Sequence, residues 1–469
     1  MGVLDTIGFS DPLAMTVFRA AAPLLKSPSE HIWVPLRIQQ SPCPLLSKGT
    51  GEGLRKMSQK RRSTDRPMSG QEVNTKTESE LQKAADFKVA FSHRLHFTRD
   101  AFEPSHPLLR QLIEDADSPQ PRRVIMAVDA GLVRVRPEII DEIHEYAAAH
   151  RDAIRLATDV LVLPGGEDAK NTPDVFNNVT KAIHDGKICR RSYVVAIGGG
   201  AILDAVGFSA ACAHRGVRLI RLPSTTLAQG DAGVGVKNGI NAFGKKNFLG
   251  SFSPAWAIVN DERMLETLSM RDFRSGFSEA VKVALLKDPQ LFETLERDAD
   301  ALFSGDLERA TPVIKRTAEL HVDHIVAGGD PFELTRARPL DFGHWAAHKL
   351  EQMTDFSLSH GEAVSIGLAL DTLYATRIGL LDSSIALRTI DILTRLGLPV
   401  SHEKLRDVPK LLDGLEEFRE HLGGQLAITM AIDIGKYIDV HEIDSRLIEQ
   451  VTHELLEVLP RRTNRYNSE

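Results

Sequence analysis

Two repeating patterns of hydrophobic and polar residues alternate along most of the chain after about residue 86. Short continuous apolar runs, such as those at 122–129 and 192–198, predict buried strands. Segments such as 137–152 and 172–187 place apolar residues three or four positions apart, which predicts helices. Because strands alternating with helices are typical of a parallel sheet covered on both faces, we predict an α/β domain over residues 86–262. The sequence FKVAFSHRLHFTRD at its start alternates apolar and polar residues and predicts a strand or a hairpin.

The second half of the chain has helical periodicity instead. Residues 271–286, 344–353 and 361–371 each carry it, so we predict an α-helical domain over residues 263–460. Together the two regions predict an α/β N-terminal domain with a parallel sheet, followed by an α-helical C-terminal domain. Residues 1–85 mix short apolar pieces with polar and basic tracts, and we expect them to form a disordered or targeting tail.

Composition narrows the kind of protein and its partners. The 469 residues are 42% hydrophobic and 26% charged, values typical of a globular chain. A formal charge of −7 provides no basic surface for nucleic acid, and no apolar run approaches the roughly 18 residues that a membrane helix needs. Cys43, Cys189 and Cys212 have no metal-type spacing and suit a reducing compartment. We therefore expect a cytoplasmic enzyme without a nucleic-acid or membrane partner.

Three consecutive glycines, Gly198 to Gly200, connect the apolar strand at 192–198 directly to a helix. Glycine lets a ligand approach the backbone, and the start of a helix offers free N–H groups to a phosphate. Asp129 and the GGE turn at 165–167 also follow predicted strands, where they could hold the ribose hydroxyls of a nucleotide. Three tight turns with a capping aspartate would explain the same residues singly, so both interpretations remain open at this point.

A cluster of three histidines lies within seventeen positions in the helical half. His344 and His348 stand four residues apart in a predicted helix, which puts both on one helical face, and His360 follows after a short polar turn. Imidazole suits zinc and other divalent metals, and a catalytic site typically supplies three protein ligands. Spacing alone pairs His344 with His348. The alternative is a set of helix-surface or hydrogen-bonded histidines without a metal.

Two charged features accompany the histidines. Lys237, Lys246 and Asn247 lie among glycines, which predicts a flexible cationic loop suited to an anionic substrate such as a phosphate. Glu279 and Lys282 stand three residues apart on a predicted apolar helix, so they are neighbours on its surface. A carboxylate among apolar residues needs a metal or a cation. Glu279 is therefore the candidate anionic partner of the histidines.

Five ordered motifs together resemble those of 3-dehydroquinate synthase and the wider sugar phosphate cyclase family. They are GGGAILDAVGFSAA, LPSTTLAQGDAGVGVKNGIN with GKKNFLGSF, GFSEAVKVALL, DFGHWAAHKLE and SHGEAVSIGLALD. The resemblance covers roughly residues 95 to 440. It implies an NAD-binding α/β domain, a helical domain and an active site in the cleft between them.

The resemblance also implies roles for individual residues. The implied ligands of zinc or cobalt are Glu279, His344 and His360. The implied catalytic residues are Asp231, Lys237, Lys282, Glu333 and His348. The implied NAD contacts are Asp129, Glu167, Lys170, Gly199, Gly200, Asp204, Ser224, Thr225 and Lys246, the last also meeting the substrate. The implied substrate contacts are Arg215, Asn247, Asp341 and His421.

The chemistry that the resemblance implies is a phosphate-eliminating cyclisation, which makes the expected enzyme a carbon–oxygen lyase. In such enzymes NAD transiently oxidises a ring hydroxyl, and phosphate then leaves by β-elimination. The ketone is reduced again, and the opened enol closes by an intramolecular aldol step to a cyclitol-type product. Zinc acts as a Lewis acid, and lysines stabilise the departing phosphate.

Several positions depart from the dehydroquinate synthase pattern. Asp341 stands where those enzymes have asparagine, and Asp323 lies near the place of a lysine. The expected arginine is displaced, since Arg336 and Arg338 flank its slot at Ala337. Arg419 and His421 are the candidates for a further substrate-binding lysine position. Loss of cations there favours a sedoheptulose 7-phosphate-like substrate over the carboxylated precursor of dehydroquinate, and both seven-carbon sugar phosphates remain open.

Two other functions remain as alternatives. An iron-type NAD-dependent polyol or alcohol dehydrogenase would share the glycine turn and the metal site, but it would release NADH during turnover. A noncatalytic homologue would have no reason to keep the metal ligands together with Lys237, Lys246 and Lys282. By analogy with the family we expect a homodimer.

Overall fold

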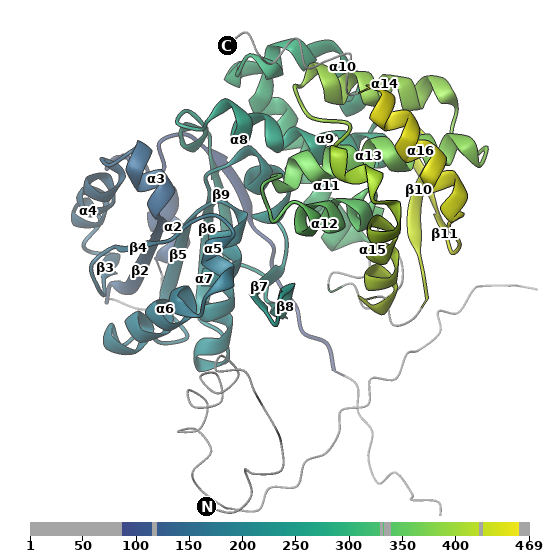
Figure 1. Cartoon of the computed structure of the whole chain (residues 1–469). Coiled ribbons are helices and arrows are strands. Elements are labelled where there is room, and N and C mark those ends of the chain that lie inside the picture. Colours follow the sequence, from purple (N-terminus) through teal and green to yellow (C-terminus); the bar gives the residue numbers. More distant parts are fainter. Residues whose placement is uncertain (1–86, 115–119, 329–331, 333–338, 422–424, 459–469) are drawn as a thin grey trace, which may run out of the picture. The chain divides into compact units, whose positions relative to one another are not determined.

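The computed structural model describes residues 87–114, 120–328, 332, 339–421 and 425–458. The tail predicted for residues 1–85 lies outside the described residues. In the described part, a parallel sheet is followed along the chain by a group of helices (Figure 1). No helix of this part is long and apolar enough to cross a membrane.

Seven parallel strands form the sheet in the order β1-β9-β6-β5-β2-β3, with β4 also paired to β2. Their bounds are Leu95–Thr98 (β1), Arg122–Asp129 (β2), Ile154–Leu156 (β3), Leu161–Leu163 (β4), Tyr193–Gly198 (β5), Arg218–Pro223 (β6) and Ala257–Asp261 (β9). Every residue of β5 is buried, as expected for a central strand covered on both faces. The strand or hairpin predicted for residues 87–100 is only partly right, because β1 alone forms there and it pairs with β9.

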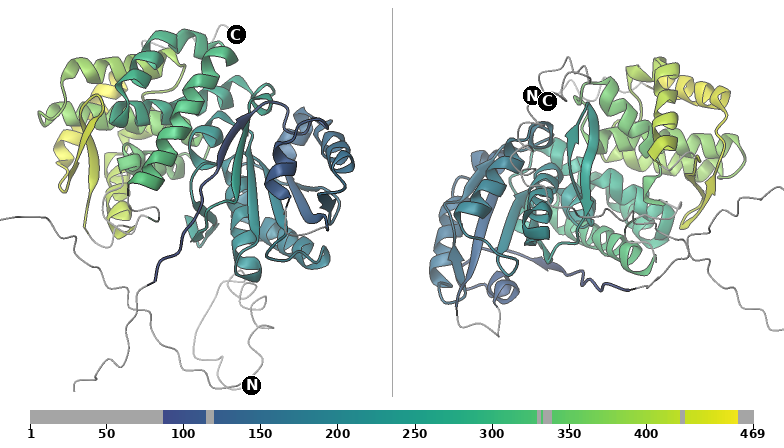
Figure 2. Two further views of the ribbon diagram at one scale, coloured as in Figure 1. Left: turned by 180° about the vertical axis from the view of Figure 1, so that it is seen from behind. Right: turned by 90° about the horizontal axis from the view of Figure 1, so that it is seen from below.

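Helices cover both faces of this sheet (Figures 1 and 2). Met126 and Val128 of β2 face one hydrophobic core, and Ile125 and Ala127 face the other. The first core is shared with α2 (Leu108–Ile113), α3 (Ala130–Val135) and α4 (Ile139–Ala149). The second is shared with α5 (Asp168–Asn171), α6 (Asp174–Asp185) and α7 (Gly200–Cys212). The predicted α/β region is thereby confirmed.

An antiparallel hairpin, β7 (Lys237–Ala242) with β8 (Lys245–Phe252), forms where the sequence predicted a flexible loop. That prediction was wrong, and Arg221 of β6 provides the physical reason. Its guanidinium is fully buried and donates hydrogen bonds to the Lys237 carbonyl oxygen at 2.8 Å and to Asn238 Oδ1 at 2.7 Å. A strand of the central sheet thus holds β7 in place.

The helical region is built around α13, which is buried on nearly all sides and packs against α9, α12, α14 and α16. The helices are α8 (Met270–Ser275), α9 (Phe277–Lys287), α10 (Pro289–Phe303), α11 (Leu307–Ala327), α12 (His344–Met353), α13 (His360–Arg377), α14 (Ser383–Arg395), α15 (Val408–His421) and α16 (Ser445–Val458). A small hairpin, β10 (Ile428–Asp433) with β11 (Lys436–Val440), adds to them. The predicted helical character is confirmed, and the boundary predicted at residue 262 remains a prediction.

Asp371, a fully buried residue of α13, holds the start of α12. Its Oδ2 atom accepts a hydrogen bond from the Gly343 N–H and its Oδ1 atom from the Trp345 indole N–H, both at 2.9 Å. Since His344 lies between these two residues, the contact fixes the first residue of α12. Burial raises the pKa of Asp371 to about 7, although both hydrogen bonds favour the ionised carboxylate.

This raised pKa predicts a specific pH dependence of stability for Asp371→Asn. Between pH 3.8, where aspartate ionises in an unfolded chain, and about pH 7, only the folded protein keeps the proton on Asp371. The contribution of this group to stability therefore falls as the pH rises. We expect the unfolding free energy of the wild type, minus that of Asp371→Asn, to decrease by at most about 1.4 kcal/mol per pH unit across this window. Urea unfolding at several pH values measures this difference.

Asp382→Asn is the matched control, because hydrogen bonds from Ser384 lower the pKa of this exposed aspartate. Its stability difference should not fall between pH 4.5 and 7.5. A constant difference for Asp371→Asn over the same window would contradict the assignment.

Candidate active site

Three side chains from three helices meet at one point. Glu279 lies in the first turn of α9, and His344 and His360 are the first residues of α12 and α13. The Glu279 Oε1 atom lies 3.3 Å from His344 Nε2 and 3.5 Å from His360 Nε2. One ligand atom from each of the three lies within 4.8 Å of the others. The set implied by the family resemblance is thus brought together in space.

Local sequence signals determine the residues at which the two histidine-bearing helices begin. Ser359 and Glu362 form a capping box, in which each side chain accepts a hydrogen bond from the other residue's backbone N–H, so α13 begins at His360. Gly343 has a φ of +78°, a left-handed conformation that favours glycine, and it lets the chain turn into α12 just before His344.

The residues fit a divalent cation. Glu279 is fully buried, and its oxygens accept no hydrogen bond of ordinary geometry from the described residues, although the Lys282 ammonium lies against Oε2. Burial alone would raise the pKa of Glu279, but Lys282 and His344 hold it well below its usual range. Burial likewise disfavours a charged His360, yet the carboxylates of Glu351 and Glu279 raise its pKa to about 9. The centre therefore favours positive charge, and one carboxylate with two imidazoles is a donor set suited to zinc or cobalt.

His348 lies beside this centre with its ring exposed to the cavity. Its ring centroid is 5.4 Å from that of His344 and 5.8 Å from that of His360. Spacing on the helix therefore predicted a true proximity. The atoms that converge on Glu279, however, belong to His344 and His360.

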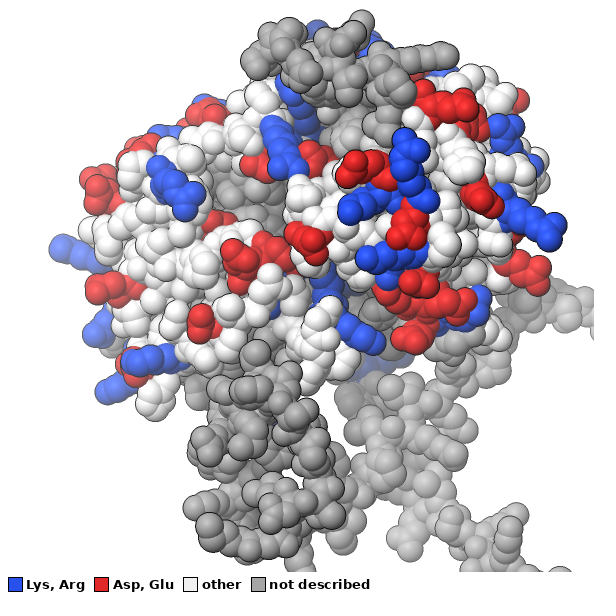
Figure 3. Space-filling model, in the orientation of Figure 1, with Lys and Arg blue, Asp and Glu red and all other residues white. Residues whose placement is uncertain are grey.

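A cavity of about 1790 Å³ extends from the carboxyl ends of the sheet strands to the histidines. Most of the predicted site residues line it, namely Asp129, Glu167, Lys170, Gly199, Gly200, Asp204, Ser224, Thr225, Asp231, Lys237, Lys246, Asn247, Lys282, Asp341, His344, His348 and His360. Basic and acidic side chains are interspersed over the visible face of the molecule (Figure 3). The cavity is large enough for a dinucleotide beside a small phosphorylated ligand, since single-ligand pockets are typically about 300–1,000 Å³.

Four predicted site residues are not among those that line the cavity. Glu279 is fully buried beside it, against His344 and His360. Arg215 is exposed in the turn before β6 and is not among the lining residues. Glu333 lies outside the described residues. His421 ends α15, but its side chain lies outside the described part of the chain.

Glycines allow the strand ends to converge on Asp129. A Cβ atom at Gly165 would lie 2.0 Å from Asp129 Oδ1, and one at Gly198 would lie 2.9 Å from Asp129 Cβ. Asp129 Oδ1 accepts a hydrogen bond from the Gly131 N–H at 2.6 Å, so this carboxylate caps α3, and burial raises its pKa. The capping interpretation of Asp129 is therefore correct, and its place at the cavity wall leaves a cofactor contact available.

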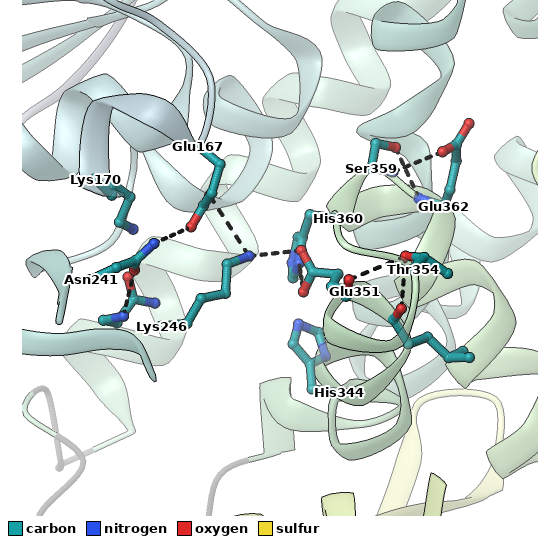
Figure 4. A network of polar contacts seen from close by, with 12 residues as sticks. Glu167, Lys170, Asn241, Lys246, His344, Glu351, Thr354, Ser359, His360 and Glu362 are labelled. Atoms are coloured by element: carbon teal, nitrogen blue, oxygen red, sulfur yellow. Dashed lines mark hydrogen bonds and ion pairs between the residues drawn. The ribbon is translucent and has the colours of Figure 1, made fainter. Parts of the chain in front are cut away.

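A chain of polar contacts joins the two sides of the cavity (Figure 4). Lys246 Nζ donates to Glu351 Oε1 at 2.7 Å and lies 3.8 Å from Glu167 Oε2. The other Glu351 oxygen, Oε2, lies 3.4 Å from His360 Nδ1. Asn241 Nδ2 donates to Glu167 Oε1 at 2.8 Å. The Glu167 side of the cavity is thus connected to a histidine of the candidate metal centre.

Sequence reasoning missed Glu351, Arg221 and His321. Glu351 is 2% exposed and stands seven residues after His344 on the same helical face, a spacing that could have been noticed. Arg221 interrupts an apolar strand, which is a signal for a buried partner. The Nδ1 atom of His321 in α11 lies 3.0 Å from Asp231 Oδ1. These two residues are far apart along the chain, so only the fold reveals their contact.

Comparisons with known proteins agree with these features. The family descriptions 3-dehydroquinate synthase N-terminal and C-terminal match residues 160–275 and 276–417. A 3-dehydroquinate synthase from Ruegeria sp. (strain TM1040) is 36% identical over 66% of this chain and 86% of its own length. A 2-epi-5-epi-valiolone synthase from Streptomyces glaucescens is 31% identical over 75% of this chain and 87% of its own.

Solved structures share the fold. ValA, a 2-epi-5-epi-valiolone synthase from Streptomyces hygroscopicus subsp. jinggangensis 5008 solved with NAD⁺ and Zn²⁺ bound, has a TM-score of 0.71. It is 28% identical and covers 80% of this chain and 99% of its own. Alcohol and polyol dehydrogenases also share the fold, at 14% to 16% identity, a level that shows the fold alone. With both family regions matched and relatives aligned along most of their length, the chain belongs to the 3-dehydroquinate synthase family of phosphate-eliminating lyases.

Proposed function

We propose that this chain is an NAD- and metal-dependent sugar phosphate cyclase that acts on a seven-carbon sugar phosphate. The observation that carries the proposal is the convergence of Glu279, His344 and His360 at one end of a cavity whose other end is formed by strand termini. The ValA structure, with NAD⁺ and Zn²⁺ bound, supports the same cofactors here.

Separate groups of residues would hold the two cofactors. Glu279, His344 and His360 would hold the metal, and the ends of β2, β4, β5 and β6 would hold NAD. Lys170, which donates to Asp204 at 2.8 Å, would lie beside the cofactor. When bound, NAD supplies reversible hydride transfer and the metal supplies a Lewis acid.

The lysines of the cavity would bind the phosphate and stabilise its charge as it departs. Lys237 and Lys246 extend from the hairpin, and Lys282 extends from α9. Because Arg221 fixes the backbone at Lys237, the side chain of Lys237 extends from an ordered strand. Preorganised cations of this kind act most strongly where charge develops during the reaction.

The charge of the helical wall favours a substrate without a carboxylate. Among the described residues from 263 onward that line the cavity, Lys282 is the one lysine or arginine, and its ammonium already faces Glu279. Asp341 contributes a carboxylate to the same wall. We therefore favour a sedoheptulose 7-phosphate-like substrate, with a valiolone-type cyclitol as product. The precursor of dehydroquinate is the second candidate, favoured by the identity to the Ruegeria synthase.

Purified protein with NAD and zinc is expected to release inorganic phosphate from sedoheptulose 7-phosphate without lasting accumulation of NADH. Phosphate would be measured colorimetrically beside the absorbance of reduced nicotinamide, with the dehydroquinate precursor tested in parallel. Steady NADH formation would favour the dehydrogenase alternative instead. Absence of phosphate release from both sugars would favour a noncatalytic homologue.

The homodimer and the cytoplasmic location stay predictions. Sedimentation of the full chain measures the first, and fractionation of cells that contain the full chain measures the second.

A further inference from the structure

Both oxygens of the Glu351 carboxylate are engaged although the residue is almost completely buried. Oε1 accepts a hydrogen bond from Lys246 Nζ at 2.7 Å, and Oε2 faces His360 Nδ1 at 3.4 Å. Glu351 lies on α12 and His360 on α13, so the contact between their side chains links the two helices (Figure 4). A buried carboxylate is stable only when such partners compensate its charge.

The contact with Glu351 defines the orientation of the His360 ring. A neutral imidazole that donates its Nδ1–H to Glu351 presents the lone pair of Nε2, and Nε2 is the atom that lies 3.5 Å from Glu279 Oε1. Carboxylates that hold the second nitrogen of a metal-binding histidine in this manner fix its tautomer and raise its basicity. Glu351 is placed to do both.

Lys246 extends this network of polar contacts to the other side of the cavity. Its ammonium lies between Glu351 and Glu167, and Glu167 is held in turn by Asn241. His348, Glu351 and His360 could form a second metal cluster by distance alone. The Lys246 ammonium already occupies Glu351 Oε1, so this position is filled by a cation of the protein.

We propose that Glu351 is a positioning residue for His360, and that Lys246 links it to Glu167 so that metal and NAD strengthen each other's binding. The inference rests on the proposed function, since it takes Glu279, His344 and His360 as the metal ligands. A metal that fixes His360 also orders the side chains of Glu351 and Lys246. NAD then loses less conformational entropy of the protein when it binds beside Glu167. By linkage, NAD strengthens metal binding by the same factor.

The positioning role is tested by the zinc dissociation constant of Glu351→Gln, measured by competition with a chromophoric chelator. Glutamine preserves the volume but offers one oxygen to two donors. We expect zinc binding about 10- to 100-fold weaker than in the wild type. Glu417→Gln is the matched control. Glu417 of α15 accepts a hydrogen bond at 2.6 Å from Lys349, which lies on α12 like Glu351, and it contacts no described histidine. The control should bind zinc as the wild type does.

A second readout separates positioning from general loss of structure. The visible absorption of the cobalt-loaded protein reports the geometry around the metal, and we expect it to change in Glu351→Gln but not in Glu417→Gln. An unchanged zinc dissociation constant together with an unchanged cobalt spectrum in Glu351→Gln overturns the positioning role.

The coupling is tested by the NAD dissociation constant of metal-free and zinc-loaded protein. We expect zinc to tighten NAD binding in the wild type by about 5-fold or more, and this ratio to approach one in Lys246→Met. Lys245→Met, which changes the neighbouring and exposed lysine, should keep the wild-type ratio. A wild-type ratio in Lys246→Met overturns the coupling.

The same measurements distinguish this inference from the proposed function. If the wild type and His344→Ala take up zinc equally, the metal centre itself is wrong and the proposed function fails. If the wild type binds zinc, His344→Ala does not and Glu351→Gln binds as the wild type does, only the inference fails.

Discussion

His360→Ala is expected to lose the bound metal and nearly all turnover while the protein still takes up NAD. The imidazole is one of three groups whose ligand atoms meet within 4.8 Å, and its removal leaves Glu279 and His344 alone. A metal Lewis acid contributes several kcal/mol of transition-state stabilisation, so phosphate release should fall by about 1,000-fold or more. Metal content after dialysis, NAD affinity and phosphate release measure the three parts of this result.

His348→Ala is the informative comparison for that experiment. This ring lies in the same cavity but outside the set that converges on Glu279, so the variant should keep its metal while its turnover falls. Metal retained by His360→Ala, or lost by His348→Ala, would show that helix spacing identifies the ligands better than the family resemblance.

Lys282→Met is expected to destabilise the metal-free protein strongly. Lys282 is 1% exposed, and its ammonium lies against Glu279, which is fully buried. Removing one partner of a buried ion pair leaves an uncompensated charge and costs about 3–5 kcal/mol. Zinc compensates the same carboxylate, so zinc should restore more unfolding free energy in Lys282→Met than it adds to the wild type. Urea unfolding with and without zinc measures both quantities.

Lys287→Met controls for the loss of a lysine from the same helix. Lys287 is partly buried near His324 Nδ1, at 3.2 Å, and it does not contact Glu279. Its stability should respond to zinc as that of the wild type does. Equal losses for Lys282→Met with and without zinc would be incompatible with a metal bound to Glu279.

Local pattern was sufficient for the elements whose burial is continuous. The apolar run at 192–198 predicted β5, because a central parallel strand is apolar on both faces. The helical spacing of apolar residues at 344–353 predicted α12. The family resemblance, confirmed by the comparisons, identified Glu279 together with His344 and His360. Local pattern marked Glu279 as a partner of the histidines but paired His344 with His348, because α9 and α13 meet only through long-range packing.

What the sequence analysis missed depends on partners that are distant along the chain. The β7–β8 hairpin is rich in glycine and lysine and lacks apolar alternation, and the buried Arg221 that holds it comes from β6. Glu351 was missed because its partners, Lys246 and His360, belong to other elements. Arg215 was assigned to the site through the resemblance, and the structure leaves it at the surface.

Three helices, α9, α12 and α13, begin around the candidate metal centre. The start of a helix carries a partial positive charge, so these ends repel a cation and attract a negatively charged oxygen. Glu279 must outweigh that repulsion to retain a metal. The same three ends would favour a negatively charged ligand oxygen at this centre, so the backbone itself would lower the pKa of a substrate hydroxyl held there.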